Sequence, residues 1–469
     1  MAYSYNQYTM NFPEFFSRHA DDEQYSSFYV RFFVVAVVVL FAITHAPINF
    51  VMSWYDRFFQ ILHASGYLSS AMVDQLAARK DSNISEIIVP VRTWIFFIAL
   101  LITAYPLFKD IRKHIEKHEH VYKDVQTYTS ILIPFGILCL LVVPSQLGLG
   151  GNMYARMSIE PLSFNDSKLW FYQRLLMPSI AYFLQLKGPV LYFFFSLFVT
   201  LLMFLLVHLF FITRGITLSR LELTSLGTSS FLMTQLQIPG YTEQLALVFI
   251  LLLFIIPTTT MGRLSLAVLS LLAHEISIVP LAFISLMYFT RKENMMLATL
   301  VFFYCFFWIA SFGGNISLLL SVRDVYGKSG WMWAVEHPYR LLAGIALSYK
   351  LLWGIIGFAI IKFQNLRVPL AGFILIAIAF TIIGVDTSRL MGFGILSLLI
   401  ALFLMKEYFT ELGMKYKYVL IGNIIVPTFF IGTNIGIALV NGIYSVGGEN
   451  GKIVLNGLYQ MIYLGVVMK

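Results

Sequence analysis

Long apolar runs separated by short polar segments dominate the chain. They recur from Phe32 to Val440, and several are long enough to cross the roughly 30 Å hydrocarbon core of a bilayer as a helix. The runs lack the residue-by-residue alternation that is typical of membrane β-strands. The pattern therefore predicts an all-α fold, a polytopic transmembrane helical bundle with about 11–13 spans.

Composition agrees with this pattern. Hydrophobic residues make up 59% of the 469 residues and charged residues only 12%, against roughly 25% charged in a soluble domain. The mean hydropathy is +0.78. No polar block is long enough to fold alone, so residues 1–469 are expected to form a single integral membrane domain. Cys139 and Cys305 lie inside apolar runs, which indicates small buried hydrophobes rather than a disulfide or metal framework.

The distribution of basic residues predicts the orientation. Residues 109–123 are the most charged stretch, and the positive-inside rule places them in the cytoplasm. The N-terminus is then cytoplasmic, the C-terminus is external, and three long loops (about 51–88, 150–188 and 313–340) are external. Apolar residues at helical spacing in the first of these loops predict helices that lie in the membrane interface. The net charge of +8 fits basic loops beside anionic lipid better than nucleic-acid binding.

Two apolar runs lie back to back between Tyr241 and Glu275, with a turn at Pro257 to Gly262 between them. If they form a hairpin, Glu243 at its start meets His274 and Glu275 at its end. Ionisable groups in such a place are costly unless they are paired, and they indicate a functional site. The alternative is that they are ordinary helix-end residues in the headgroup layer.

The second apolar run continues past His274-Glu275 as far as Phe289, and this leaves two alternatives open. Leu264 to Phe289 could be one long helix that is kinked near Pro280. It could also be two short helices that meet at His274-Glu275. We favour two helices, because they return Arg291-Lys292 to the cytoplasm.

Further ionisable residues fall at the external ends of the predicted helices. They are Asp56, Arg174, Asp386 and Arg389. Asp386 and Arg389 are three positions apart, so on a helix they share one face and could pair. The alternative interpretations are a simple helix-end ion pair for these two residues, and an Arg174 side chain that reaches to the lipid headgroups.

Several chemistries lack their motifs. There is no Walker A loop, no clustered Cys/His site and no Gly-x-Ser-x-Gly elbow, and the segment that begins at His274 lacks the second histidine of HExxH. Carboxylates, a histidine and arginines remain, under loops rich in aromatic residues. This set suits a lipid-linked phosphosugar: a carboxylate takes the proton of an acceptor hydroxyl, and a cation stabilises the departing lipid phosphate.

The chain resembles the GT-C class of integral-membrane glycosyltransferases. The resemblance rests on the expected helix count, on Asp56 shortly after the first span, and on a long first external loop with interfacial helices. It implies sugar transfer from a polyprenyl-phosphate donor to a glycan or lipid acceptor, at the external face of the bacterial inner (cytoplasmic) membrane. It also implies that Asp56 is the base or holds the acceptor. The chain departs from the class where Arg57, rather than a second acid, follows Asp56, and it has no soluble external domain.

These considerations give a set of candidate residues and partners. The catalytic candidates are Asp56, Glu243 and Glu275, and the substrate-binding candidates are Arg174, His274, Asp386 and Arg389. No metal ligands or cofactor are assigned, and a divalent metal is left open. The expected partners are a lipid-linked sugar donor, a glycan or lipid acceptor and membrane lipids, without nucleic acid. The alternatives are an O-antigen or capsule polymerase, a flippase of lipid-linked sugars, or a secondary transporter, although the chain shows no clear internal repeat.

Overall fold

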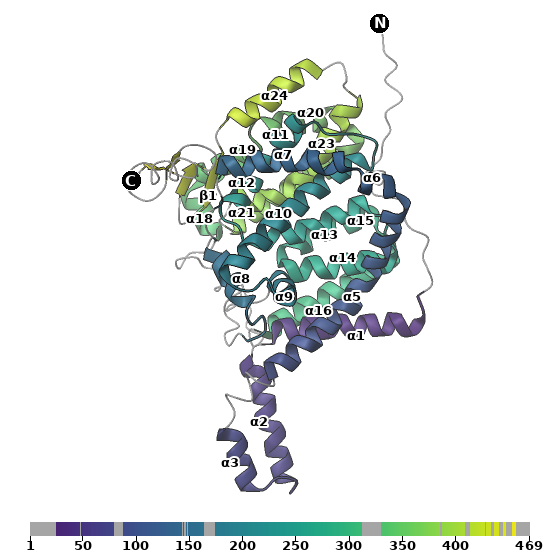
Figure 1. Cartoon of the computed structure of the whole chain (residues 1–469), viewed down its shortest axis with the longest axis vertical. Helices are drawn as coiled ribbons and strands as arrows, with labels where there is room; N and C mark the ends of the chain where they lie inside the picture. The colour runs from purple at the N-terminus through teal and green to yellow at the C-terminus, as the bar shows by residue number, and fades with distance from the viewer. Residues whose placement is uncertain are drawn as a thin grey trace.

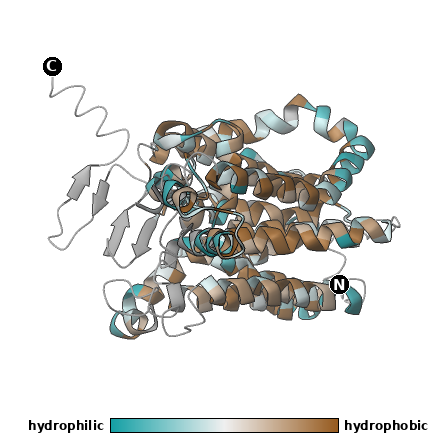
Figure 2. Ribbon diagram, turned by 90° about the horizontal axis from the view of Figure 1, so that it is seen from below, coloured by the Kyte–Doolittle hydropathy of each residue, from teal (hydrophilic) through white to brown (hydrophobic). Residues whose placement is uncertain are grey.

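The computed structural model describes residues 25–46, 48–78, 88–142, 144, 147, 149–163, 174–311, 330–384, 387–408, 413–426, 428–432, 436–439, 444–446 and 453–455. Helices dominate this part of the chain, which confirms the predicted all-α bundle (Figure 1). Within it, six helices are long and apolar enough to cross a membrane, and four shorter apolar helices accompany them. Figure 2 shows hydrophobic residues along the packed helices and hydrophilic residues toward their ends and connections.

Helices α1 and α5 lie at one side of the bundle, next to an arm formed by α2 and α3 (Figure 1). α1 packs on α5, where the Tyr29 hydroxyl donates to the Ile102 carbonyl over 3.0 Å. α2 and α3 extend away from the other helices (Figure 1), and Phe58 and Ile61 of α2 are exposed, as in a helix that lies in the membrane interface. The bounds are α1 Ser27–His45, α2 Ile48–Ala64, α3 Ser70–Ala78, α5 Val89–Lys117, α6 Glu119–Lys123, α7 Val125–Val142, α8 Leu149–Met157 and α9 Leu176–Phe183.

Helices α13 to α15 lie at the centre. α13 and α14 form the antiparallel hairpin that the sequence predicts, and the Ser270 hydroxyl of α14 donates to the Ala246 carbonyl of α13. α14 then ends, because His274 has an extended backbone (φ −160°, ψ 126°), and α15 begins after the short 3-10 turn η4 (Glu275–Ser277). The bounds are α10 Gly188–Ile212, α11 Arg220–Gly227, α12 Ser230–Gln237, α13 Glu243–Ile255, α14 Thr260–Ala273, α15 Ile278–Tyr288 and α16 Arg291–Ser311.

The two-helix alternative is therefore the one that the structure shows. Pro280 lies in the first turn of α15, where its missing N–H removes no hydrogen bond. α15 returns toward the start of α14, because Glu293, which follows α15, pairs with Arg263 in the first turns of α14. The α14–α15 hairpin thus has its tip at His274-Glu275 and both its outer ends on the same side of the bundle.

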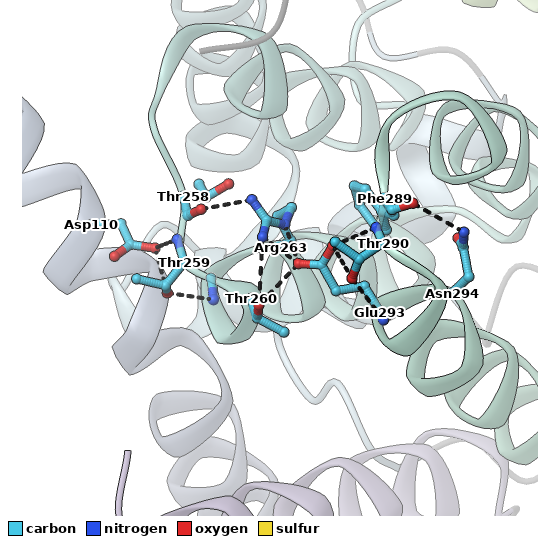
Figure 3. A network of polar contacts seen from close by, with 10 residues as sticks. Asp110, Thr258, Thr259, Thr260, Arg263, Phe289, Thr290, Glu293 and Asn294 are labelled. Carbon is cyan, nitrogen blue, oxygen red and sulfur yellow. Dashed lines mark hydrogen bonds and ion pairs between the residues drawn. The ribbon is translucent and has the colours of Figure 1, made fainter. Parts of the chain in front are cut away.

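A buried polar network fixes those outer ends (Figure 3). Arg263 donates from Nε to Oε1 of Glu293 over 2.7 Å and from Nη1 to the Thr258 carbonyl over 2.8 Å. The amide and the hydroxyl of Thr259 donate to Oδ2 of Asp110 on α5 over 2.9 and 3.0 Å. The Arg263–Glu293 pair is almost fully buried. The network therefore holds α5, the α13–α14 turn and the α15–α16 connection together.

The C-terminal half adds a second group of helices and two short antiparallel strand pairs, β1–β2 and β3–β4. α24 ends at Ile425, although apolar residues continue to Val440, because Pro427 follows and cannot donate a helical hydrogen bond. The bounds are α18 Gly330–Glu336, α19 Pro338–Tyr349, α20 Trp353–Lys362, α21 Arg367–Gly384, α22 Thr387–Leu390, α23 Ile395–Tyr408, α24 Gly413–Ile425, β1 Phe429–Gly432, β2 Gly436–Leu439, β3 Tyr444–Val446 and β4 Ile453–Leu455.

Buried or half-buried basic side chains cap several helix ends. Arg92 donates to a carbonyl in the last turn of α1 over 2.6 Å, Arg214 to one in the last turn of α13 over 2.6 Å, and Lys350 to the carbonyl just after α24 over 3.0 Å. The last carbonyls of a helix have no intrahelical partner and carry a partial negative charge. These cations satisfy them, so helices can end inside apolar surroundings.

Many basic connections lie at one end of the bundle, which we call the basic end. Asp110, at the start of the basic segment 109–123, contacts the α13–α14 turn. Arg214 contacts the end of α13, and Lys406 donates to the Thr217 carbonyl in the α10–α11 connection over 2.6 Å. The start of α13 and the end of α14 therefore point away from the basic end.

Candidate functional site

A buried group of charged residues, which we call the central cluster, surrounds the start of α13 and the tip of the α14–α15 hairpin. Its members are 1–8% exposed. Each is carried by a helix end or an irregular segment, where the chain changes direction. They are Arg174 before α9, Glu243 at the start of α13, His274 and Glu275 between α14 and α15, and Arg389 on the short helix α22.

Arg174 and Glu275 form a two-point ion pair. Nε and Nη2 of Arg174 donate to the two carboxylate oxygens of Glu275 over 2.7 and 2.5 Å, and Nη1 donates to the hydroxyl of Tyr154 over 3.2 Å. Both charged side chains are only 6% exposed. Such a fork of parallel hydrogen bonds is among the strongest side-chain interactions, so the charge of Glu275 is compensated locally.

His274 lies between the two glutamates. Its Nδ1 accepts the backbone N–H of Ile276 over 3.2 Å, so the neutral ring carries its proton on Nε2. Nε2 faces Oε1 of Glu243 at 3.5 Å, and Nδ1 lies 3.4 Å from Oε2 of Glu275. The ring is thus oriented toward Glu243 by a backbone contact of its own segment.

Glu243 is the less constrained of the two acids. Its Oε1 lies 3.4 Å from Nη1 of Arg389 and faces His274, whereas its Oε2 is buried and has no hydrogen-bond partner among the described residues. The guanidinium of Arg389 is also stacked 3.6 Å from the centre of the Tyr241 ring, a cation–π contact. Glu243 therefore presents one carboxylate oxygen beside a cation that an aromatic ring holds in place.

The central cluster lies inside the length of the bundle rather than at its rim. The backbone N–H of Gly240 donates to the Ser196 hydroxyl of α10 over 2.5 Å, and the Tyr192 hydroxyl donates to the Gly240 carbonyl over 3.2 Å. Because α10 begins at Gly188, this level is about 6–12 Å inside that helix end at 1.5 Å per residue. The charges are thus held at the depth of a spanning helix.

A tight backbone contact brings α8 to this level. A side chain at Gly151 would lie 2.5 Å from the Pro239 carbonyl, and Gly240 has a positive φ of 106°. Both positions need glycine, because only a residue without Cβ allows this approach and this conformation. The contact sets α8, and with it the buried Tyr154, beside Arg174.

The structure brings five of the seven candidate residues together and leaves Asp56 apart from them. Asp56 is half-buried on α2, which Figure 1 shows away from the helices that carry the central cluster. Asp386 lies outside the described residues. The roles of both stay predictions.

Sequence reasoning missed three uncharged members of the site, Tyr154, Gln235 and Gln244. All three are fully buried. Gln244 on α13 donates from Nε2 to Oε1 of Gln235 on α12 over 2.5 Å. In the sequence, each of them is only an uncharged polar residue inside or beside an apolar run. Such residues are also common at ordinary helix ends, so the sequence does not distinguish them.

Comparisons with protein-family models, with curated proteins and with solved structures found no match to this chain. Among the described residues, no group of three or more His, Cys, Asp or Glu side chains is arranged to hold a metal ion. The chemistry of the site therefore has to be inferred from its own side chains.

Proposed function

We propose that the protein is a membrane glycosyltransferase that moves a sugar from a polyprenyl-phosphate donor to an acceptor hydroxyl. The observation that carries the proposal is the environment of Glu243: a buried carboxylate whose Oε2 has no hydrogen-bond partner among the described residues, beside Arg389 and His274. A carboxylate with a spare oxygen can accept a proton, and adjacent cationic and N–H groups can bind a phosphate.

Glu243 is a better general base than the other two acids. Glu275 uses both carboxylate oxygens in its pair with Arg174, so protonating it would cost that interaction. Asp56 lies on α2, apart from the central cluster (Figure 1). We therefore transfer to Glu243 the role that the GT-C resemblance implies for Asp56.

The proposed step is a single displacement. The acceptor hydroxyl oxygen attacks the anomeric carbon of the donor, its proton passes to Oε2 of Glu243, and the bond from that carbon to the phosphate oxygen breaks. The electron pair of this bond leaves with the lipid phosphate, which gains one negative charge. Arg389 neutralises this charge and Nε2–H of His274 donates to it, as pre-positioned groups do at a developing anion. The backbone N–H of Ile276 holds the His274 ring in position through Nδ1.

We further propose that the N-terminus is cytoplasmic, the C-terminus is external and the acceptor arrives from the external side of a bacterial cytoplasmic membrane. The gathering of Arg214, Lys406 and the 109–123 segment at the basic end supports this orientation, since positive residues favour the cytoplasm. The central cluster is at the other end of α13 and α14 and would then open outward.

The test is transfer of a radiolabelled sugar from undecaprenyl phosphate in proteoliposomes, with a panel of glucose, galactose and N-acetylglucosamine donors. Glu243→Gln should lower the rate by about 10²–10⁴ and leave the protein folded, because the amide cannot accept the proton. Asp74→Asn, an exposed acid on α3, is the matched control and should keep the wild-type rate. A dead Asp56→Asn variant beside an active Glu243→Gln variant would return the role of base to Asp56.

Three other functions remain candidates. An O-antigen or capsule polymerase would use the same donor and the same groups, with a growing glycan as acceptor, and a flippase would bind that donor without cleaving it. The helix break at His274-Glu275 inside the bundle favours a secondary transporter, since unwound helices often line transport sites. Uptake driven by an ion gradient, in proteoliposomes that show no sugar transfer, would establish the transporter instead.

A further inference from the structure

Two buried glutamine side chains lie side by side between α12 and α13. Gln235 of α12 and Gln244 of α13 have no exposed surface, and a single hydrogen bond of 2.5 Å links their amides. This bond leaves Nε2 of Gln235 and Oε1 of Gln244 without a partner among the described residues. The nitrogen and oxygen of a side-chain amide can be assigned either way round. If both amides are flipped, Gln235 donates to Gln244 instead, and one N–H donor group and one carbonyl acceptor are still left unpaired.

Such buried and unpaired amide groups are unfavourable unless something else binds them. Gln244 directly follows Glu243, whose Oε2 is also unpartnered, and α12 packs against α22, which carries Arg389. Gln244 is thus adjacent in the chain to one group that we assign to the reaction, and Gln235 lies on a helix that packs against the helix carrying another. Both amides belong to the same part of the molecule, but they carry no charge.

The combination of one donor and one acceptor selects the kind of ligand. A phosphate offers acceptors only and would be repelled by the carbonyl oxygen, and a metal cation would be repelled by the amide N–H groups. A polyprenyl chain has no polar group to bind them. A sugar hydroxyl both donates and accepts, so two neighbouring hydroxyls can satisfy both amides at once.

We propose that the Gln235–Gln244 pair is the sugar-binding subsite, which holds two hydroxyl groups of the transferred sugar while Arg389 and His274 hold the phosphate. This proposal rests on the proposed glycosyl transfer. It divides the ligand into a neutral part at the amides and an anionic part at the central cluster. The amides then determine which sugar binds, whereas the affinity for the lipid phosphate depends on the central cluster.

The experiment compares two probes on the purified full chain by native mass spectrometry. The probes are undecaprenyl phosphate and the same lipid phosphate carrying each of the three panel sugars. Wild-type protein should prefer one sugar-bearing lipid over the bare phosphate by about tenfold, the ratio that corresponds to about one to two hydrogen bonds. Gln235→Met/Gln244→Met should abolish this preference and keep the affinity for the bare phosphate within about twofold.

The double variant removes both partners of the buried bond, so neither amide is left alone and the chain should still fold. Gln237→Met, two positions further along α12 and half-buried, is the matched control and should keep the preference. If the double variant retains the preference, the amides hold buried water and the subsite is refuted. If wild type binds the bare phosphate without preferring any sugar, the subsite is refuted and the glycosyltransferase proposal stands, whereas failure to bind either probe refutes both.

Discussion

Replacing Arg174 by Met tests how the central cluster is held together. The substitution removes both hydrogen bonds to Glu275 and leaves its carboxylate buried at 6% exposure without its cation. Removing one partner of a buried ion pair costs about 3–5 kcal/mol, because the remaining charge has lost its compensation. The two charge-assisted bonds, at about 1.5–3 kcal/mol each, sum to about 3–6 kcal/mol, which overlaps this range. We expect a loss of this size in the free energy of unfolding.

A double-mutant cycle shows how much of this loss comes from the interaction between Arg174 and Glu275. Arg174→Met/Glu275→Gln removes the stranded charge as well, so it should recover at least about 2 kcal/mol of the loss. The assay is reversible unfolding in mixed detergent micelles, followed by the fluorescence of the seven tryptophans. An Arg174→Met variant within about 1 kcal/mol of wild type, or strictly additive single and double variants, would refute a tightly coupled buried pair.

Two further predictions concern packing and orientation. Gly151→Ala should destabilise the fold by about 1–3 kcal/mol, because the added Cβ would meet the Pro239 carbonyl. Gly136→Ala is the control and should not destabilise it, because the added Cβ would have no atom within 4 Å. Thermal unfolding of both variants measures the difference. In a variant without native cysteines, an impermeant thiol reagent applied to intact cells should label the exposed position of Gln185→Cys and leave Lys117→Cys unlabelled. Labelling of Lys117→Cys alone would reverse the orientation.

The sequence predicts the central hairpin well because its signals are local. A turn with Pro257 and Gly262 separates two apolar runs, and basic residues after the second run favour a return to the cytoplasm. These signals locate Glu243, His274 and Glu275 at one level. The same reasoning places Arg174 and Arg389 at helix ends on that side, and the structure joins them to the cluster.

Other features depend on contacts between distant segments and leave no local signal. Tyr154 belongs to a segment that composition assigns to an external loop, yet α8 enters the bundle because Gly151 and Gly240 allow the backbones to touch. The bond between Gln235 and Gln244 requires α12 and α13 to face each other, and no periodicity encodes that choice of faces. The importance assigned to Asp56 came from the resemblance to a family, which carries no information about where α2 lies.

The α14–α15 hairpin is fixed at its two outer ends, on the side of the bundle opposite its tip. The start of α14 is bonded to Asp110 of α5, and Arg263 and Glu293 tie it to the connection after α15 (Figure 3), while the tip carries His274 and Glu275. The depth of the tip is therefore set from the opposite side of the bundle. If the proposed glycosyl transfer holds, residues that recognise the acceptor can therefore change without changing the depth of His274 and Glu275.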